Sequence, residues 1–255
     1  MTALDVVIVI AGSGVVGVLG GLLGVGGGVF LVPFLVFAGV CGPKEAVAIS
    51  LCCVVGTSAA ASKVSAASGL ARLDVSLSLE PALAIGAVLA SAVLGKAEDG
   101  AVLVGFAALM AVIVALMLYR RRRGTKPGDD AEPSTARVVA VVCAAFCSGA
   151  ASGFFGVGGG VLVVPALVII LRLPLKVAAA TSSMCLMTSA ACGAAVHFAN
   201  GLLRPDIVAA AIVGVLPGGF LGARLQRRVP DTVLEALFVL LAVVVIGLSL
   251  FRGLR

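Results

Sequence analysis

The sequence GLLGVGGGVFLVP, residues 21–33, returns almost unchanged as GFFGVGGGVLVVP at residues 153–165. A shift of 132 positions (153 − 21) aligns residues 21–74 with residues 153–206 without a gap, and 23 of the 54 positions are identical. The matched polar pairs are Lys44 with Lys176, Ser50 with Ser182, Arg72 with Arg204, and Asp74 with Asp206. Shared apolarity alone does not bring such residues into register, so the chain is predicted to contain two copies of one unit.

The composition of the chain places these units in a membrane. Of the 255 residues, 61% are apolar and 12% are charged, and the mean hydropathy is +1.24, whereas soluble domains carry roughly 25% charged residues. Uncharged runs occupy residues 6–43, 100–119, 138–171 and 177–203, and ~20 helical residues cross a hydrocarbon core of ~30 Å. The predicted fold class is an all-α, polytopic integral membrane protein, which excludes a soluble enzyme of ordinary build and a disordered chain.

Hydrophobic runs and helix-start residues predict five helical segments in each unit. In repeat 1 (residues 1–119) they cover 4–23, 29–41, 45–68, 77–95 and 101–119, with Glu80 and Pro81 in the first turn of the fourth. In repeat 2 (residues 138–255) they cover 137–155, 160–171, 176–199, 206–227 and 232–251. The first span is expected to be retained, because no basic region or cleavage site typical of a signal peptide accompanies it.

The polar segment 120–137 separates the units and is predicted to be a cytoplasmic linker, because it begins with the cluster Arg120–Arg123. Clusters of Lys and Arg beside a span mark that face of the membrane. The topology depends on segments 29–41 and 160–171. If they cross fully, each unit has five crossings and the repeats are inverted; if they are re-entrant, each unit has four and the repeats are parallel. The placement of Lys and Arg favours five plus five.

Other patterns in the chain do not indicate a site. Gly12-x-Gly14-x-x-Gly17 has the spacing of a dinucleotide-binding loop but lacks the later acidic residue. Close helix packing is expected there and at Gly218-Gly219-x-x-Gly222. The seven cysteines lie in apolar runs without a C-x-x-C pair, so we expect buried thiols and no metal site. The basic residues are not interleaved with aromatic ones, which argues against nucleic-acid binding.

The glycine triplets are the main candidate for a binding site. They are Gly26, Gly27 and Gly28 in repeat 1 and Gly158, Gly159 and Gly160 in repeat 2. Transporters built from repeats commonly bind substrate between broken helices at the repeat interface. A glycine break frees backbone N–H groups where no water is present, and an anion at a helix N-terminus satisfies them. Close packing of helices is the alternative interpretation.

Hydroxyl and ionisable side chains supply further candidates. Ser50, and the run Thr181, Ser182 and Ser183, lie near the starts of the following helices, where a hydroxyl either caps the helix or binds a substrate oxygen. Ionisable groups inside a membrane are functional candidates. The candidates for coupling transport to H⁺ or Na⁺ are Lys63, His197 and Asn200. For Lys63 the alternative is a side chain that extends to the membrane surface, and no cofactor beyond a coupling ion is expected.

The doubled G-x-G-G-G-x-x-x-x-P motif, each copy followed by a Ser-bearing helix, resembles the sulfite exporter TauE/SafE family, also called the 4-toluene sulfonate uptake permeases. The resemblance extends over both repeats. It implies a bacterial or archaeal inner-membrane carrier for small anions, typically organosulfonates, sulfite or related carboxylates. It further implies that residues 24–28 and 156–160 line the site.

These observations predict a secondary transporter that binds a small anion between the two breaks and works by alternating access. An enzyme is not expected, because the spans hold no cluster of catalytic side chains. ATP-driven transport is not expected either, because a nucleotide-binding motif is missing. The alternatives are a passive anion channel and a membrane assembly or scaffold protein. The expected partners are the anion and the lipid bilayer, with monomer and homodimer both open.

Overall fold

The computed structural model describes residues 3–123, 135–226 and 228–253, and this part of the chain forms ten helices and no strand. Repeat 1 contributes α1 (Ala3–Leu23), α2 (Gly28–Phe37), α3 (Pro43–Ser68), α4 (Leu73–Leu94) and α5 (Asp99–Arg123). Repeat 2 contributes α6 (Thr135–Phe155), α7 (Gly160–Ile170), α8 (Leu175–Ala199), α9 (Pro205–Gln226) and α10 (Asp231–Gly253). Seven of these described helices are long and apolar enough to cross a membrane. The prediction of an all-α, polytopic membrane protein is confirmed.

The helix boundaries follow the predicted segments, with one correction at α4. This helix begins at Leu73 and not at residue 77, so Glu80 and Pro81 lie about two turns inside it. The start is early because the chain turns sharply at Gly69, whose φ of 65° is a conformation that glycine adopts readily. The predicted linker 120–137 is shorter in the structure, since α5 continues to Arg123 and α6 begins at Thr135. Residues 124–134 lie outside the described residues.

The two short helices fold back along the helices that precede them. With 10 and 11 residues and a rise of 1.5 Å per residue, α2 and α7 are about 15 and 17 Å long, roughly half of a hydrocarbon core. The ring of Phe34 in α2 lies beside Gly12 of α1, and Gly27 lies beside Gly20. Segments 29–41 and 160–171 therefore contain half-helices, which by themselves are too short for a full crossing.

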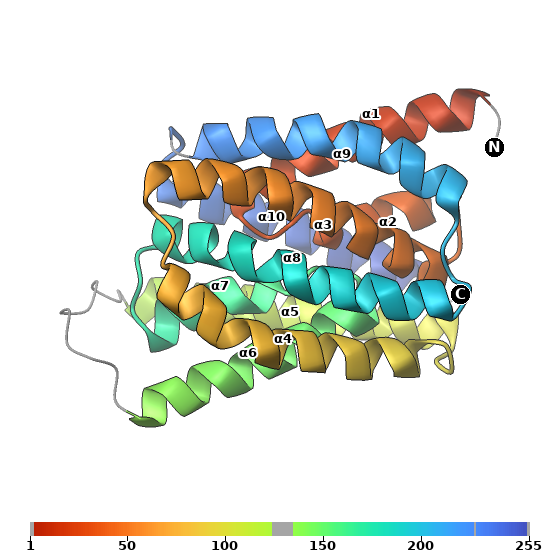
Figure 1. Ribbon diagram of the computed structural model, residues 1–255. Coiled ribbons are helices and arrows are strands. Elements are labelled where there is room, and N and C mark those ends of the chain that lie inside the picture. Colours follow the sequence, from red (N-terminus) through yellow and green to blue (C-terminus); the bar gives the residue numbers. More distant parts are fainter. Residues whose placement is uncertain (1–2, 124–134, 227, 254–255) are drawn as a thin grey trace.

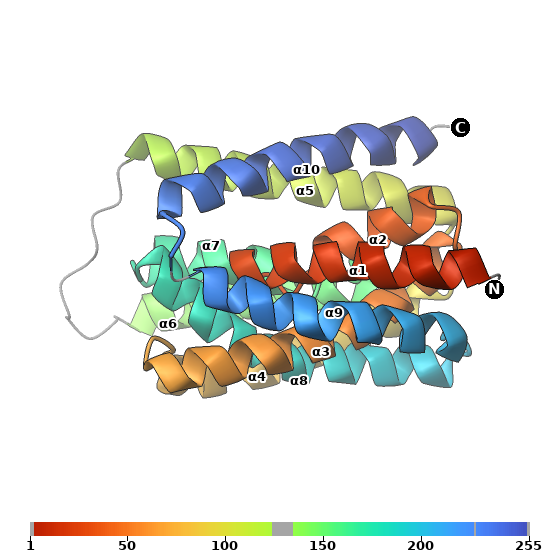
Figure 2. The ribbon, with the colours of Figure 1, turned by 90° about the horizontal axis from the view of Figure 1, so that it is seen from above.

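The repeats pack through equivalent pairs of helices. α1 lies beside α9 and α4 lies beside α6, while α3 packs on α8 and α5 packs on α10 (Figures 1 and 2). α1 to α5 of repeat 1 correspond to α6 to α10 of repeat 2. Exchanging the two repeats therefore converts the α1–α9 pair into the α6–α4 pair, and each of the other two pairs into itself. The molecule therefore has approximate twofold symmetry, with α3 and α8 next to the axis.

Equivalent helices of the two repeats run in opposite directions. α3 and α8 are antiparallel, because Ser62 donates a hydrogen bond to the carbonyl of Ser183 while Leu51 lies beside Gly193. In Figure 1, α1 begins and α10 ends at one end of the bundle, and α5 ends and α6 begins at the other. These are the helix directions of an inverted arrangement, in which α2 and α7 provide the short returning segments.

Glycines allow the paired helices to approach closely. A Cβ atom added to Gly17 of α1 would lie 2.7 Å from the carbonyl oxygen of Val215 in α9. One added to Gly86 of α4 would lie 2.8 Å from the backbone nitrogen of Ala150 in α6. Such distances leave no room for a side chain, so the glycines of the N-terminal Gly-x-Gly-x-x-Gly sequence serve helix packing, as predicted.

Candidate functional site

Each half-helix begins directly after a chain break formed by glycines in the left-handed backbone region. The φ angles are 68° at Gly24, 79° at Gly26 and 78° at Gly27. In repeat 2 they are 69° at Gly156, 77° at Gly158 and 72° at Gly159. Residues with a Cβ atom rarely adopt these angles. Glycine is therefore required at these six positions by the path of the backbone itself, in addition to any role in packing.

The two breaks touch each other in the interior of the protein. A Cβ atom on Gly28 would collide with the carbonyl oxygen of Gly156. One on Gly160 would lie 2.9 Å from the Cα atom of Val25 and 3.2 Å from the carbonyl oxygen of Gly24. Residues that are far apart in the sequence are thus brought into direct contact at the approximate twofold axis.

Two equivalent side chains of the long central helices cover this contact. Val54 of α3 lies against Gly26 and Gly158, and Leu186 of α8 lies against Gly26 and Gly160. Val54 and Leu186 are related by the repeat shift (186 − 54 = 132) and are both fully buried. The contact between the breaks is therefore enclosed by apolar side chains from both repeats, which lowers the local dielectric and strengthens electrostatic interactions there.

The N-terminal ends of the two half-helices meet at this contact. α2 begins at Gly28 and α7 begins at Gly160, and the two helices extend away toward opposite ends of the bundle (Figure 2). A helix N-terminus carries roughly half a positive charge and unpaired N–H groups. Throughout the described chain, the N–H groups of residues 26–28 and 158–160 donate no backbone hydrogen bond. Two positive helix ends with free donors favour a bound anion.

Hydroxyl groups of α3 satisfy carbonyl groups of the breaks. The Ser50 hydroxyl donates to the carbonyl of Gly156 at 2.7 Å, and the Thr57 hydroxyl donates to the carbonyl of Gly26 at 2.6 Å. A buried carbonyl without such a donor would be costly. Ser50 thus connects repeat 1 to the break of repeat 2, and in this structure its proton is directed at the protein and not at a ligand.

Ser182 occupies the equivalent position in repeat 2 but makes no such bond. It is fully buried, and its hydroxyl has no hydrogen-bond partner among the described residues. The buried hydroxyls of Ser58 and Ser152 are also unpartnered, and Ser58 Oγ lies 3.5 Å from the position of a Cβ on Gly26. Burying an unpaired hydroxyl costs roughly 1–3 kcal/mol, so these hydroxyls are suited to contact a ligand oxygen.

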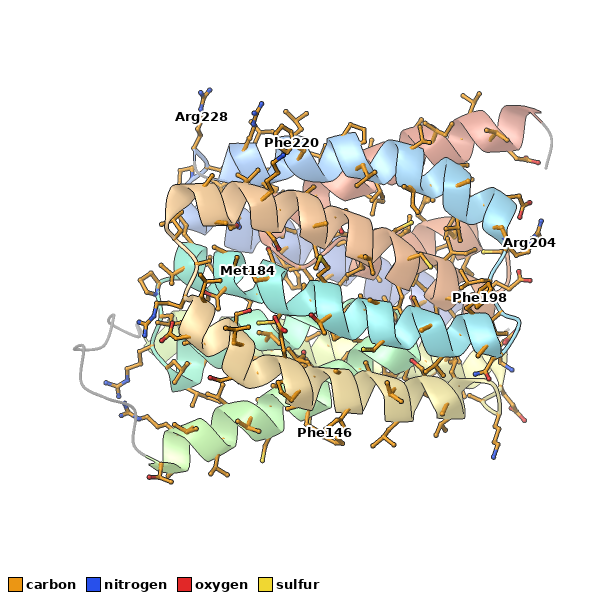
Figure 3. The ribbon with its side chains drawn as sticks, viewed as in Figure 1. Phe146, Met184, Phe198, Arg204, Phe220 and Arg228 are labelled. Carbon is orange, nitrogen blue, oxygen red and sulfur yellow. The ribbon has the colours of Figure 1, made fainter. Side chains whose placement is uncertain are left out.

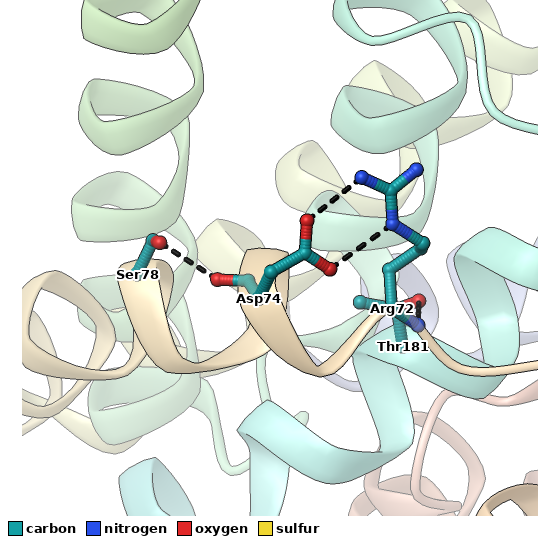
Figure 4. Close-up of polar contacts among 4 residues, drawn as sticks. All are labelled: Arg72, Asp74, Ser78 and Thr181. Atoms are coloured by element: carbon teal, nitrogen blue, oxygen red, sulfur yellow. Dashed lines mark hydrogen bonds and ion pairs between the residues drawn. The ribbon is translucent and has the colours of Figure 1, made fainter. Parts of the chain in front are cut away.

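The other two hydroxyls of the predicted run are engaged away from the breaks. The Thr181 hydroxyl accepts a hydrogen bond from the backbone N–H of Arg72 at 3.0 Å (Figure 4). It donates to the carbonyl of Val177 at 2.8 Å. The Ser183 hydroxyl donates to the carbonyl of Ala179, within its own helix, at 2.9 Å. Of the predicted hydroxyls, Ser50 contacts the breaks directly. Ser182 lies on the face of α8 between Ala179, which contacts Gly24, and Leu186, which contacts Gly26 and Gly160. Thr181 and Ser183 bond elsewhere.

The ionisable candidates do not form one cluster: His197 and Asn200 lie one turn apart at the end of α8, and Lys63 lies at the opposite end of the bundle. His197 is fully buried; its Nε2 is 2.9 Å from the carbonyl oxygen of Gly153, and its Nδ1 has no partner among the described residues. Asn200 caps the end of α8 and is exposed. Lys63 is exposed near the end of α3 and lines a surface groove. The structure therefore does not unite His197, Asn200 and Lys63 in one relay.

A narrow cavity reaches the first break from the end of the bundle where α5 ends. It extends from Val25 to the beginning of α8, and Lys176 and Gln226 are its polar lining residues. Its volume of about 20 Å³ holds one water molecule. The described conformation is therefore nearly closed between this end and the glycine breaks.

The cysteines are only partly as predicted. Cys53 and Cys185 are buried, but Cys143 and Cys147 are exposed, because they lie on the outward face of α6. In the loop before α3, burial and the nearby Glu45 raise the pKa of the Cys41 thiol to about 12, against a smaller opposite effect of Arg204. No group of three or more His, Cys, Asp or Glu side chains suited to a metal ion occurs among the described residues.

Sequence comparison of the repeats did not single out the hydroxyls of α6. Ser148 donates to the carbonyl of Gly159, and Ser152 is unpartnered close to the second break. Their counterparts in repeat 1 are Val16 and Gly20 (148 − 132 and 152 − 132), so a search for residues shared by both repeats passes over them. A comparison of the helices that precede the two triplets would have found them, because serines in repeat 2 stand where repeat 1 has Val16 and Gly20.

The chain contains two repeats of membrane-length helices. In each repeat one helix is broken, and the half-helix after the break begins at a buried contact between the repeats. These features define a membrane transporter of the broken-helix class. The comparison with protein families agrees with this class. The family described as "Sulfite exporter TauE/SafE" matches residues 9–250. The chain belongs to this family.

Two curated relatives carry transporter names over nearly the whole chain. A Xylella fastidiosa (strain Temecula1) protein named "Probable membrane transporter protein" is 34% identical over 242 residues, which cover 89% of this chain and 87% of the relative. The Bacillus subtilis (strain 168) protein named "Probable membrane transporter protein YunE" is 29% identical over 246 residues, which cover 88% and 89%. No solved structure matches the chain at a significant level. The protein is thus a multi-pass membrane protein of a transporter family.

Proposed function

We propose that the protein is a secondary transporter that binds a small anion at the contact between the two glycine breaks and moves it across the inner membrane by alternating access. The observation that carries this proposal is the meeting of two half-helix N-termini whose N–H groups donate no backbone hydrogen bond. The unpartnered hydroxyl of Ser182 lies on the face of α8 that contacts the breaks through Ala179 and Leu186. All of these groups present hydrogen-bond donors, so the ligand must present acceptors. A sulfonate, sulfite or carboxylate group meets this requirement.

The residues of the site take different roles in this proposal. The N–H groups of Gly26, Gly27 and Gly28 and of Gly158, Gly159 and Gly160 hold the anion, and Ser182 donates a further hydrogen bond. Ser50 keeps the break of repeat 2 in place through its bond to Gly156. The enclosure by Val54 and Leu186 favours a small substrate, because the described contact leaves little free space.

Alternating access requires that the route from each end of the bundle opens in turn. The narrow cavity at the end where α5 ends, lined by Lys176 and Gln226, is the position at which we expect the route from the cytoplasm to open. A small rocking of one repeat against the other would widen it, because its lining comes from both repeats. Coupling to H⁺ or Na⁺ completes the proposal, and the buried His197 is the candidate for a proton.

Transport assays with matched glycine variants test the site. We expect Gly27→Leu and Gly159→Leu, each at a φ above 70°, to reduce uptake of radiolabelled sulfite or sulfoacetate into proteoliposomes at least tenfold. The control is Gly247→Leu, because Gly247 lies in α10 with open space around its Cα. Uptake that survives in both triplet variants, with melting temperatures like that of the control, would contradict the site.

Counterflow and ligand stabilisation distinguish the proposed mechanism from its alternatives. In vesicles preloaded with an excess of unlabelled substrate, a carrier exchanges this substrate for external label and so accumulates the label transiently. A passive channel does not accumulate the label. A bound anion raises the melting temperature of the purified protein, because ligand that binds only the folded state stabilises it. If sulfite, thiosulfate, taurine, sulfoacetate and small carboxylates all fail to shift the melting temperature, the proposed substrate class is wrong.

A further inference from the structure

A groove with three basic side chains lies on the surface of the protein, away from the glycine breaks. Its volume is about 700 Å³, and its charged lining residues are Lys63 near the end of α3 and Arg224 and Arg228 at the end of α9. Among the residues that the structure describes, no carboxylate lines the groove. Three like charges around one open groove repel one another, so an anion between them would be stabilised.

The floor of the same groove is apolar. It consists of Val64 and Ala67 of α3 and Phe220, Leu221 and Leu225 of α9. The guanidinium carbon of Arg224 lies 4.1 Å from the ring centroid of Phe220, an interaction that orients the guanidinium and leaves its N–H groups free to donate. The groove thus offers cationic donors at its rim and an apolar surface beneath them.

The apolar surface continues along the outward face of α9 into the region of the membrane. Val213, Leu216 and Leu221 are 60%, 41% and 51% exposed, and their spacing places them on one side of the helix with Arg224. Figure 3 shows Phe220 on α9 and Arg228 beyond its C-terminal end, both at the outer edge of the molecule. An occupant of the groove can therefore extend from the basic rim along a surface that faces the acyl chains of the bilayer.

We propose that this groove binds an anionic phospholipid, with the phosphodiester group held by Lys63, Arg224 and Arg228 and an acyl chain lying along Phe220 and Leu221. The charge of the rim is complementary to the phosphate. The apolar floor explains why a lipid fits better than a free anion, since a small anion would leave the floor in contact with water. This site is separate from the proposed transport site and does not depend on it.

Native mass spectrometry of the purified full-length protein tests the proposal. The probes are phosphatidylglycerol, phosphatidylcholine and inorganic phosphate. We expect phosphatidylglycerol to bind and phosphatidylcholine to bind more weakly, and inorganic phosphate at the same concentration not to displace phosphatidylglycerol. Each basic residue near an anionic lipid contributes a factor of about five to affinity, so Arg224→Gln with Arg228→Gln should weaken phosphatidylglycerol binding roughly 25-fold.

The matched control is Arg137→Gln with Arg172→Gln, which removes two exposed positive charges from the same end of the bundle but outside the groove. This control should retain phosphatidylglycerol binding within about twofold. The proposal is overturned if both double variants lose affinity equally, if the two lipids bind equally, or if inorganic phosphate displaces the lipid. Melting temperatures in phosphatidylcholine, unchanged in both variants, show that the variants are folded.

Discussion

Two equivalent serines, Ser50 and Ser182, make different contacts in the folded protein. Ser50 donates to the carbonyl of Gly156, whereas the Ser182 hydroxyl, equally buried, has no partner among the described residues. A hydroxyl that binds the protein contributes to stability, and one without a partner does not. The difference between the two serines agrees with the proposal that Ser50 has a structural role and Ser182 binds the ligand.

This difference predicts opposite effects of two alanine variants. Ser50→Ala should destabilise the protein by about 1–3 kcal/mol, because the Gly156 carbonyl loses its donor. Ser182→Ala should raise the melting temperature, because it removes a buried hydroxyl without a partner, and should reduce substrate affinity several-fold. Thermal melting in detergent and uptake in proteoliposomes measure the two effects. Equal melting temperatures for the two variants, or full uptake by Ser182→Ala, would show that the assignment of roles is wrong.

At the scale of elements, glycine pairs decide how closely the long helices pack. In the α1–α9 pair, a Cβ on Gly218 would collide with the carbonyl oxygen of Gly14. Its counterpart Gly86 (218 − 132) meets the backbone of α6 in the α4–α6 pair. Helices in lipid associate through such close packing, since no hydrophobic driving force holds them together there.

The symmetry of these contacts predicts that Gly218→Val and Gly86→Val have similar consequences. Each should lower stability by at least about 1–3 kcal/mol, because the added side chain forces the paired helices apart. Gly247→Val is the matched control, because no atom lies within 4 Å of a Cβ at Gly247. Melting temperature and the fraction of monodisperse protein in size-exclusion chromatography report the effect. If either variant had the melting temperature and the monodisperse fraction of the control, the helix pairing would be contradicted.

At the scale of the whole molecule, the two ends of the bundle differ in charge. At the end where α5 ends, the described helices and turns carry the basic residues Lys63, Arg72, Arg120–Arg123, Arg137, Arg172, Lys176, Arg224 and Arg228 and the acidic residues Asp74, Glu80, Asp231 and Glu235. At the opposite end, Lys44, Lys96, Arg204 and Arg252 are accompanied by Asp5, Glu45, Glu98, Asp99 and Asp206. From the positive-inside rule we therefore predict that the first end faces the cytoplasm.

Labelling of single cysteines tests this orientation. In a variant without its native cysteines, a cysteine at position 96 should react with a membrane-impermeant maleimide added to intact cells, and one at position 172 should not. Permeabilised cells provide the control, in which both positions should react. Reaction at position 172 from the outside, with protection at position 96, would reverse the proposed orientation.

The sequence alone predicted much of the local structure. The ten helical segments and the two breaks follow from hydrophobic periodicity and from glycines, which are local properties of the chain. The start of α4 was misplaced because Pro81, a common residue in the first turn of a helix, here lies inside one. The exposure of Cys143 and Cys147 was missed because apolar residues of a membrane helix face lipid as readily as protein.

The sequence by itself determined that the chain is a duplicated membrane protein whose half-helices begin at glycine triplets. Only the tertiary structure decided that Gly28 touches Gly156, that the repeats run in opposite directions, and that Ser50 and Ser182 have different partners. The physical reason is the separation along the chain of the residues that determine each feature. Backbone conformation at a glycine depends on its immediate neighbours, whereas a hydrogen bond between residues 50 and 156 depends on how two whole repeats dock, and a shift of about 1 Å removes it.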